Sequence, residues 1–274
     1  MRDELKYLTD FLVEKKRVDI SRFDNTFLLK SIQKRMDETR CDTMESYYAL
    51  LDQYPPESDE FLQSLQINYS EFFRNPLTFS VLEKIVLPSL AQRKSRSKRK
   101  EIRIWSAACA GGQETYSLSM LLNEFNTGKV NKQDFRIFAT DISENHVGVA
   151  SKGQYPKSAL NMITLKRLNE WFSKKGDVYS VKSQLKENID FSVFDLLNPE
   201  FSSPPASIFG DFDIVFCANL LFYFKPEYRT LILDKLGRCL ADGGVMITGE
   251  TEREILMKNN YQEVYPQSAI FRKM

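Results

Sequence analysis

The first 66 residues show the spacing of amphipathic helices and none of the alternation of strands. The apolar positions that recur at this spacing are Leu5, Leu8, Leu12, Phe27, Leu28, Ile32, Met36, Tyr47, Leu50 and Leu51. The stretch contains no glycine, and Tyr54-Pro55-Pro56 is typical of a helix end. The pattern predicts an all-α N-terminal domain over residues 1–66.

From Glu101 onward, short apolar runs of the kind found in buried strands alternate with amphipathic helices. Strands are expected within 101–110, 134–143, 212–224 and 245–250, and helices within 114–125, 143–151, 158–174 and 226–240. Alternation of this kind predicts an α/β fold, a doubly wound and mainly parallel sheet with right-handed crossovers. The sheet domain is expected to cover residues 101–274.

One part of this second domain departs from the pattern. Residues 178–197 alternate apolar and polar positions in a way that suggests short antiparallel strands. We therefore expect a small antiparallel β insert over about 176–194. Residues 67–100 are expected to link the two domains.

The composition excludes some classes of protein. The chain has 274 residues, of which 42% are apolar, so it can bury a core and is not disordered as a whole. Its 38 lysines and arginines nearly balance 37 aspartates and glutamates, for a net charge of +1. This balance argues against a surface devoted to nucleic acid or to an anionic membrane.

The basic run QRKSRSKRK at 92–100 is the exception to that balance. Runs of like charge are usually solvated, which favours a linker between the domains. A nucleic-acid patch is the alternative, but no aromatic residue is interleaved with the cations.

Four cysteines lie far apart, and the chain has a single histidine. Neither a disulfide framework nor a metal site is expected.

The N-terminal MRDELKYLTD is too charged for a signal peptide. The most apolar stretch, 212–224, is shorter than the ~20 residues of a membrane helix. These features predict a cytoplasmic protein that does not insert into a membrane.

Candidate ligand-binding residues follow two of the expected strands. In a doubly wound sheet the ligand lies outside the carboxyl ends of the strands. Small residues fill 106–112, so backbone amides can approach a ligand there. The segment has neither G-x-G-x-x-G nor a P-loop lysine, so it suits a nucleotide phosphate poorly.

Two carboxylates stand at this edge. Glu114 opens the first helix and could face a cationic ligand group, while Asp141 ends the second strand and suits a ribose diol. Either could instead be an ordinary helix cap. A ligand with a ribose, a cationic amino-acid end and no phosphate is S-adenosylmethionine (SAM).

The chain resembles the CheR-type chemoreceptor glutamate methyltransferases over nearly its whole length. Five segments in the family's order carry the resemblance: INYSEFFRNPLTF (67–79), IWSAACAGGQETYSLSM (104–120), FATDIS (138–143), FDLLNP (194–199) and FDIVFCANLLFYF (212–224). The resemblance implies a class I, Rossmann-like SAM methyltransferase. Such an enzyme esterifies glutamates on the cytoplasmic helical bundle of chemoreceptors and releases S-adenosylhomocysteine.

The resemblance also implies site residues. The cofactor-binding set is Asn68, Ser70, Arg74, Glu114, Asp141, Asp195, Leu196, Ala218 and Asn219. Within it, the linker 67–100 supplies the first three, Asp141 binds the ribose, and the Asp195-Leu196 pair lies near the adenine. Arg74 and Tyr223 are the residues implied to orient the acceptor carboxylate.

This sequence departs from the family pattern at several positions. Ala218 stands where the family usually has arginine, so a cation beside the substrate pocket is missing. Asp195 replaces an asparagine and loses an amide donor. Gln113 and Thr115 replace Glu and Pro, and residues 251–253 read Thr-Glu-Arg where the family has a Ser-Glu-Asn-like segment.

Two regions resemble receptor-binding parts of the family. The β insert is similar to the subdomain with which some members grip a receptor's C-terminal tether. Lys30, Lys34, Arg35 and Arg40 resemble a basic receptor-docking helix, although a plain solvated face fits them almost as well. His146 is expected at the surface, and the protein is expected to be a monomer.

Three alternatives remain open at this point. A methyltransferase for nucleic acid or small molecules typically shows [DN]PP[FY] after the fourth strand, where this chain has CANLLFYF. Ala218 motivates the second alternative, a SAM-binding signalling module with weak activity. The third is an interaction protein that binds no SAM.

Overall fold

The computed structural model describes residues 2–66, 70–207 and 210–274. The chain forms two compact units. The first combines Met1–Ile67 with Leu221–Arg229, and the second combines Asn68–Leu220 with Thr230–Met274.

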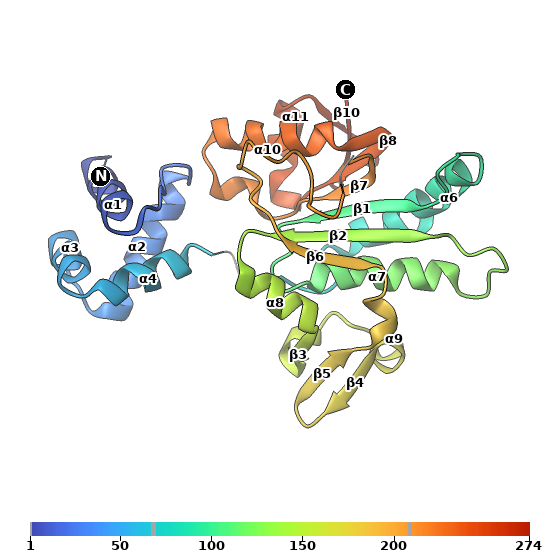
Figure 1. Cartoon of the computed structure of the whole chain (residues 1–274), viewed down its shortest axis with the longest axis horizontal. Coiled ribbons are helices and arrows are strands. Elements are labelled where there is room, and N and C mark those ends of the chain that lie inside the picture. The colour runs from blue at the N-terminus through green and yellow to red at the C-terminus, as the bar shows by residue number, and fades with distance from the viewer. Residues whose placement is uncertain (1, 67–69, 208–209) are drawn as a thin grey trace. The chain divides into compact units, whose positions relative to one another are not determined.

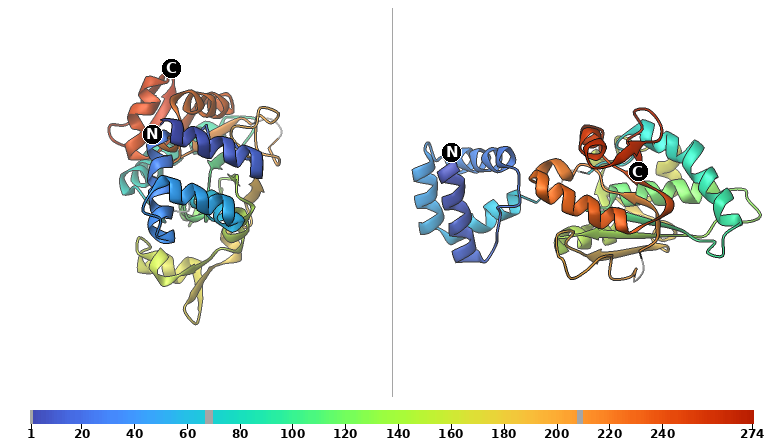
Figure 2. Two further views of the ribbon diagram at one scale, coloured as in Figure 1. Left: turned by 90° about the vertical axis from the view of Figure 1, so that its left-hand side faces the viewer. Right: turned by 90° about the horizontal axis from the view of Figure 1, so that it is seen from above.

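The first unit contains the expected N-terminal helices, which pack into one cluster (Figure 2). They are α1 (Arg2–Lys16), α2 (Asn25–Thr39), α3 (Met44–Gln53) and α4 (Pro55–Ser64). Asp24 and Thr43 cap α2 and α3 with their side chains, and Pro55 stands in the first turn of α4.

A buried ion pair joins α2 to α4 in this unit. Arg35 donates from Nε and Nη2 to the two carboxylate oxygens of Glu57, at 2.8 and 2.6 Å, and the Tyr47 hydroxyl donates to the same carboxylate at 2.9 Å. Glu57 is buried. Arg35, one of the four cations of the expected docking face, is thus half-buried and paired within the helical cluster. Lys30, Lys34 and Arg40 are exposed.

The segment 221–229 completes the first unit. The Asp24 N–H donates to the Tyr223 carbonyl at 2.8 Å, and the Phe23 and Phe224 rings stack with centroids 5.3 Å apart. The unit is thus assembled from two stretches of chain that are far apart in sequence.

The second unit is built on a seven-stranded sheet in the order β6-β2-β1-β7-β8-β10-β9 (Figure 1). Its strands are β1 (Ile102–Ala107), β2 (Phe135–Asp141), β6 (Ile189–Val193), β7 (Phe212–Phe216), β8 (Leu240–Ile247), β9 (Tyr261–Glu263) and β10 (Ile270–Lys273). The pairs among β6, β2, β1, β7 and β8 are parallel, and β10 is antiparallel to both neighbours. The expected doubly wound, mainly parallel fold is confirmed.

Helices precede and connect these strands. They are α5 (Pro76–Val81), η1 (Leu82–Val86), α6 (Leu87–Ser95), α7 (Gln113–Asn126), α8 (Glu144–Lys152), η2 (Lys157–Leu160), α9 (Leu165–Trp171), η3 (Ser183–Leu185), η4 (Leu221–Tyr223), α10 (Pro226–Arg238), η5 (Glu250–Glu252) and α11 (Arg253–Lys258). One large apolar cluster unites α5, α6, α7 and the strands β1, β2, β7 and β8. In the described part of the chain, no helix is long and apolar enough to cross a bilayer.

The small antiparallel sheet exists, but its expected bounds were wrong. It consists of β3 (Gln154–Pro156), β4 (Phe172–Lys175) and β5 (Val178–Val181), in the order β3-β5-β4 (Figure 1). Part of the expected helix at 158–174 is therefore strand β4. Residues 189–193 pair in parallel with β2 at the edge of the main sheet. Alternation predicts a half-buried strand but not the sheet that it joins.

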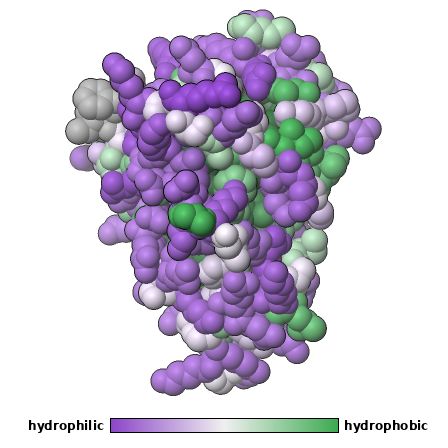
Figure 3. Space-filling view, turned by 90° about the vertical axis from the view of Figure 1, so that its right-hand side faces the viewer, coloured by the Kyte–Doolittle hydropathy of each residue, from purple (hydrophilic) through white to green (hydrophobic). Residues whose placement is uncertain are grey.

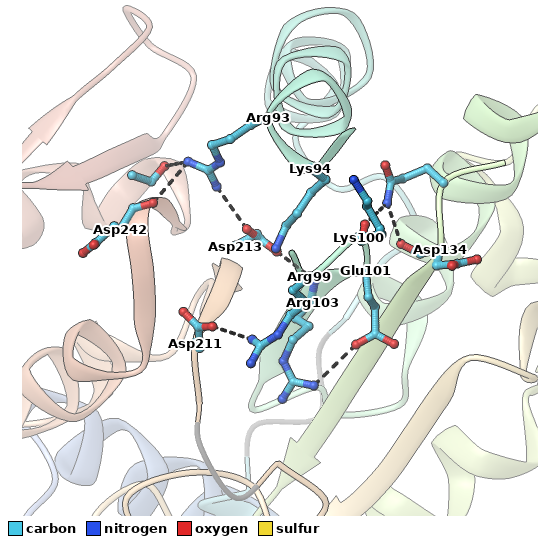
Figure 4. Close-up of polar contacts among 12 residues, drawn as sticks. Arg93, Lys94, Arg99, Lys100, Glu101, Arg103, Asp134, Asp211, Asp213 and Asp242 are labelled. Atoms are coloured by element: carbon cyan, nitrogen blue, oxygen red, sulfur yellow. Dashed lines mark hydrogen bonds and ion pairs between the residues drawn. The ribbon is translucent and has the colours of Figure 1, made fainter. Parts of the chain in front are cut away.

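The basic run at 92–100 is not the solvated linker that its charge suggested. It begins inside α6, where Arg93 and Lys94 contact the carboxylate of Asp213 on β7 at 3.0 and 2.8 Å (Figure 4). The Arg103 N–H donates to the same carboxylate at 3.0 Å, and Asp213 is only 1% exposed. Arg99 pairs with Asp211. The run thus fastens α6 to β7 within the second unit.

The rest of the run lies at a hydrophilic surface. Figure 3 views the second unit from the side of α6 and of the loop between α7 and β2, and polar residues dominate that face. Arg96 and Lys98 are exposed. Arg93, Lys94 and Arg99 therefore make ion pairs within the second unit, whereas Arg96 and Lys98 are exposed to solvent.

Lys94→Met should lower the free energy of unfolding by roughly 3 kcal/mol. Removing one partner of a buried ion pair leaves the other charge poorly compensated, although Arg93 still contacts Asp213. Lys98→Met, at an exposed position of the same run, is the matched control and should change stability little. Urea unfolding of both variants measures the difference. Equal stability of the two variants would show that Asp213 does not depend on Lys94.

Candidate functional site

A strained loop follows β1 and leads into α7. Ala108 and Ala110 have φ angles of 58° and 46°, in the left-handed region that non-glycine residues rarely adopt. Gly112 has φ of 84°, and a Cβ there would lie 2.9 Å from the Ala150 side chain. This tight path brings the backbone at 108–112 to the carboxyl end of the sheet. Strain of this kind is concentrated at ligand-binding sites.

Asp141, at the end of β2, holds this loop. Its Oδ2 accepts the Ala110 N–H at 2.9 Å, and its Oδ1 accepts the Ser143 N–H at 2.9 Å. Ser143, not Asp141, is the residue that caps α8. The helix-cap interpretation of Asp141 is therefore wrong, and its carboxylate faces the loop after β1.

His146 was expected at the surface, and this prediction is wrong. It is buried, and its Nδ1 lies 3.1 Å from Asp141 Oδ1. The imidazole thus belongs to the surroundings of Asp141 and not to the outer face of α8. His146 is the third residue of α8 and follows Asp141 by five positions, so its place just after the strand end was the available signal.

Glu114 lies in the first turn of α7 and accepts a hydrogen bond from Ser106 Oγ at 3.0 Å. Burial raises the pKa of Glu114 to about 8, and the negative charge of Glu252 adds to the rise. The Ser106 hydrogen bond and the positive charge of Arg74 act in the opposite direction. A buried carboxyl of this kind is neutral at pH 7 and becomes ionised when a cation approaches.

Arg74 is presented by a second strained loop. Its neighbours Phe73 and Asn75 have φ angles of 48° and 101°. The Phe73 N–H donates to Ser117 Oγ on α7 at 2.9 Å, and the Phe72 ring packs edge-on against Tyr155 of the small sheet. These anchors hold the loop on α7, where the charge of Arg74 acts on Glu114.

The loops after β7 and β8 meet at one carboxylate. Asn219 is left-handed, with φ of 59°. Its N–H donates to Glu252 Oε2 at 2.7 Å, and Thr248 Oγ1 and the Gly249 N–H donate to the same oxygen at 2.8 and 2.9 Å. Ala218 packs against the apolar core. Glu252 is fully buried and was not a candidate from the sequence.

The segment after β6 reaches the same edge of the sheet. The Phe194 N–H donates to the Asp141 carbonyl at 2.9 Å, which places 194–196 beside the end of β2. Asp195 Oδ1 accepts the Leu197 N–H at 2.8 Å, and Leu196 is buried. The Asp195 carboxylate therefore shapes its own turn.

Three remaining candidates stand apart. Asn68 lies outside the described residues. Ser70 is half-buried in the second unit, two residues before the anchored Phe72. Tyr223 belongs to the first unit, where its ring contacts Phe27 with centroids 4.7 Å apart.

The second unit thus gathers three carboxylates at the carboxyl ends of β1, β2 and β8, of which Asp141 and Glu252 are buried and Glu114 is half-buried. Such a site favours a ligand with positive charge and hydroxyl groups. Gln113 Oε1, at the start of α7, is buried without a hydrogen-bond partner among the described residues. An unpaired acceptor there fits an ammonium group. The residues present therefore fit SAM. Within the described ranges, no three potential metal ligands cluster together.

A cavity of about 600 Å³ lies elsewhere. It is lined by the C-terminal end of α7, by the start of β2 and by residues such as Glu170 and Asn188. Because β2 starts where Asp141 is farthest away, this cavity is separate from the site.

Comparisons with known proteins identify the family of this chain. Residues 68–270 match the family described as "CheR methyltransferase, SAM binding domain". The "Chemotaxis protein methyltransferase 1" of Pseudomonas aeruginosa is 34% identical over 208 residues, which cover 74% of this chain and 72% of that protein. The "Chemotaxis protein methyltransferase" of Listeria monocytogenes is 28% identical, over 90% of this chain and 88% of that protein. This chain therefore belongs to the CheR methyltransferase family and is a SAM-dependent chemotaxis protein methyltransferase.

Proposed function

We propose that this methyltransferase esterifies glutamate side chains on the cytoplasmic helical bundle of chemoreceptors. The observation that carries the proposal is Arg74, held on a strained and anchored loop where its positive charge lowers the pKa of the half-buried Glu114. A guanidinium in that place can bind an acceptor carboxylate by charge-assisted hydrogen bonds.

The chemistry needs no general base from the protein. A glutamate carboxylate has a reference pKa of about 4.3 and is already ionised at neutral pH. The only histidine, His146, contacts Asp141. The site's task is to hold the acceptor oxygen, the methyl carbon and the sulfur in line, and such alignment can supply up to ~7–11 kcal/mol of the barrier.

SAM supplies an electrophilic methyl group on a sulfonium. Asp141 would accept from its ribose hydroxyls, and Asp195 and Leu196 would lie along its adenine. Glu114, Ala218 and Asn219 would surround its amino-acid end.

Three further assignments rest on the family resemblance. Asn68 and Ser70 would close over the cofactor from the segment that precedes Arg74. Tyr223 would help Arg74 to orient the acceptor.

The small sheet offers a place for a receptor's C-terminal tether. In the order β3-β5-β4, the strand β4 is an edge strand, with backbone groups available to an added strand. Lys30, Lys34 and Arg40 on the exposed face of the N-terminal helices would contact the receptor bundle. Both assignments are part of the proposal.

The proposal is tested with methyl-labelled SAM and a fragment of a cognate chemoreceptor. We expect label to pass to the receptor and to be released by mild base, which is the signature of a carboxyl ester. Label that resists base, or that goes to nucleic acid or small molecules, would contradict the proposal. SAM binding without any transfer would favour a signalling module. In that case Ala218→Arg should be assayed, because Ala218 stands where the family usually carries arginine.

A further inference from the structure

Glu252 is a buried carboxylate to which neither the sequence nor the comparisons assign a role. It is 0% exposed and lies in η5, directly after the loop that follows β8. A single oxygen, Oε2, accepts hydrogen bonds from Asn219, Thr248 and Gly249 at 2.7 to 2.9 Å. Three donors on one buried oxygen form a strong and directional anchor.

These hydrogen bonds join two loops that leave adjacent strands. Asn219 follows β7, whereas Thr248 and Gly249 follow β8, and the two strands are paired in parallel. A Cβ on Gly249 would lie 2.6 Å from Asn219 Nδ2, so the amide of Asn219 rests directly on the Gly249 backbone. The left-handed φ of 59° at Asn219 costs free energy, which the hydrogen bond to Glu252 offsets.

Glu252 also faces the remainder of the site. Its charge raises the pKa of Glu114 on α7 and that of the Cys217 thiol at the end of β7. The same design occurs at the other end of the site, where Asp141 holds the left-handed Ala110 by its N–H. The strained loops after β1 and β7 are thus each held by a buried carboxylate from a neighbouring element.

We propose that Glu252 is a positioning residue for SAM binding, which acts by fixing the backbone of Asn219. The inference deepens the proposed function, since it rests on Asn219 contacting the cofactor. It assigns Glu252 no contact with SAM or with the acceptor.

The experiment measures SAM affinity by calorimetric titration for wild type, Glu252→Ala, Glu252→Gln, Asn219→Ala and the Glu252→Ala/Asn219→Ala pair. Glu263→Gln is the matched control, because Glu263 also anchors a loop, by accepting from Arg253 and from the Ala269 N–H at 2.9 Å each. Thermal unfolding of each variant confirms that it is folded before its affinity is compared.

We expect Glu252→Ala to weaken SAM binding at least tenfold. The double variant should bind no more weakly than Asn219→Ala alone, because both changes remove the same positioned group. Glu252→Gln keeps an oxygen acceptor and should restore affinity to within about threefold of wild type, and Glu263→Gln should leave affinity unchanged.

Unchanged affinity in folded Glu252→Ala would overturn the proposal. So would fully additive losses in the double variant, because a general structural role predicts additivity. If Glu252→Ala does not fold, the comparison of Glu252→Gln with Glu263→Gln decides. A glutamine carries one amide oxygen in place of the charged one, so Glu252→Gln should then weaken binding two- to threefold, and equal affinities would overturn the proposal. None of these measurements uses a receptor, so failure of receptor methylation is a separate result.

Discussion

Arg74→Ala is expected to reduce methyl transfer to a receptor fragment at least ~100-fold at saturating SAM. This is the scale of loss when a reactant is misplaced by about an ångström. The loop that carries Arg74 is anchored through Phe73 and Ser117, so the backbone should keep its place when the side chain is removed. The turnover number, measured with the receptor fragment in excess, gives the result.

Two control variants sharpen this test. Arg74→Lys keeps a charge but loses the fork that binds a carboxylate through two donors, so it should recover only part of the activity. Arg136→Ala removes another arginine of the same unit, one near the start of β2 that pairs with Asp190 on β6 at 2.6 Å. It should be as active as wild type. An active Arg74→Ala enzyme would remove Arg74 from the transfer step.

The affinity for SAM should rise steeply with pH between about 5.5 and 7.5. In the free protein the pKa of Glu114 is about 8, so the carboxyl is protonated and neutral in this range. A cationic ligand beside it favours the ionised form and lowers that pKa. Binding then releases a proton, and affinity increases with pH, up to about tenfold per unit, until the pH approaches 8.

Calorimetry in buffers of different ionisation enthalpy measures the released proton directly. Glu114→Gln should remove most of the slope. Glu124→Gln is the matched control on the same helix, since Glu124 is bound to Arg167 at 2.7 Å at the opposite end of α7. A pH profile that is unchanged in Glu114→Gln would show that Glu114 does not face the cation.

The periodicity of the sequence was enough to predict the central strands β1, β2, β7 and β8 of the main sheet, because parallel strands and their covering helices are each marked by local patterns. The small sheet was predicted to exist but was placed too late in the chain. Its strands 154–156 and 172–175 are short and lie on either side of a helix, so no local alternation marks them. The edge strand 189–193 alternates as an antiparallel strand would, although its partner β2 is parallel.

The site shows the same division. The positions of Glu114 and Asp141 at the carboxyl ends of β1 and β2 were predictable because they follow from the fold, whereas their roles toward SAM stay predictions. Glu252 and His146 were missed, because each acts through a contact that depends on how two loops or a helix turn fold back. The buried ion pair between Lys94 and Asp213 could not be predicted from the charge of the run at 92–100, because Asp213 lies more than a hundred residues later in the chain.

The segment 221–229 has a consequence for the exchange of modules between relatives. Evolution or engineering that replaces the N-terminal helices must also replace the partners of Phe23 and Asp24, which are Phe224 and Tyr223. A graft at residue 67 alone would pair foreign helices with native aromatic residues. The N-terminal helices and the nine residues 221–229 therefore form one structural module. A receptor preference that resides in either part can be transferred to a relative only when both parts are exchanged together.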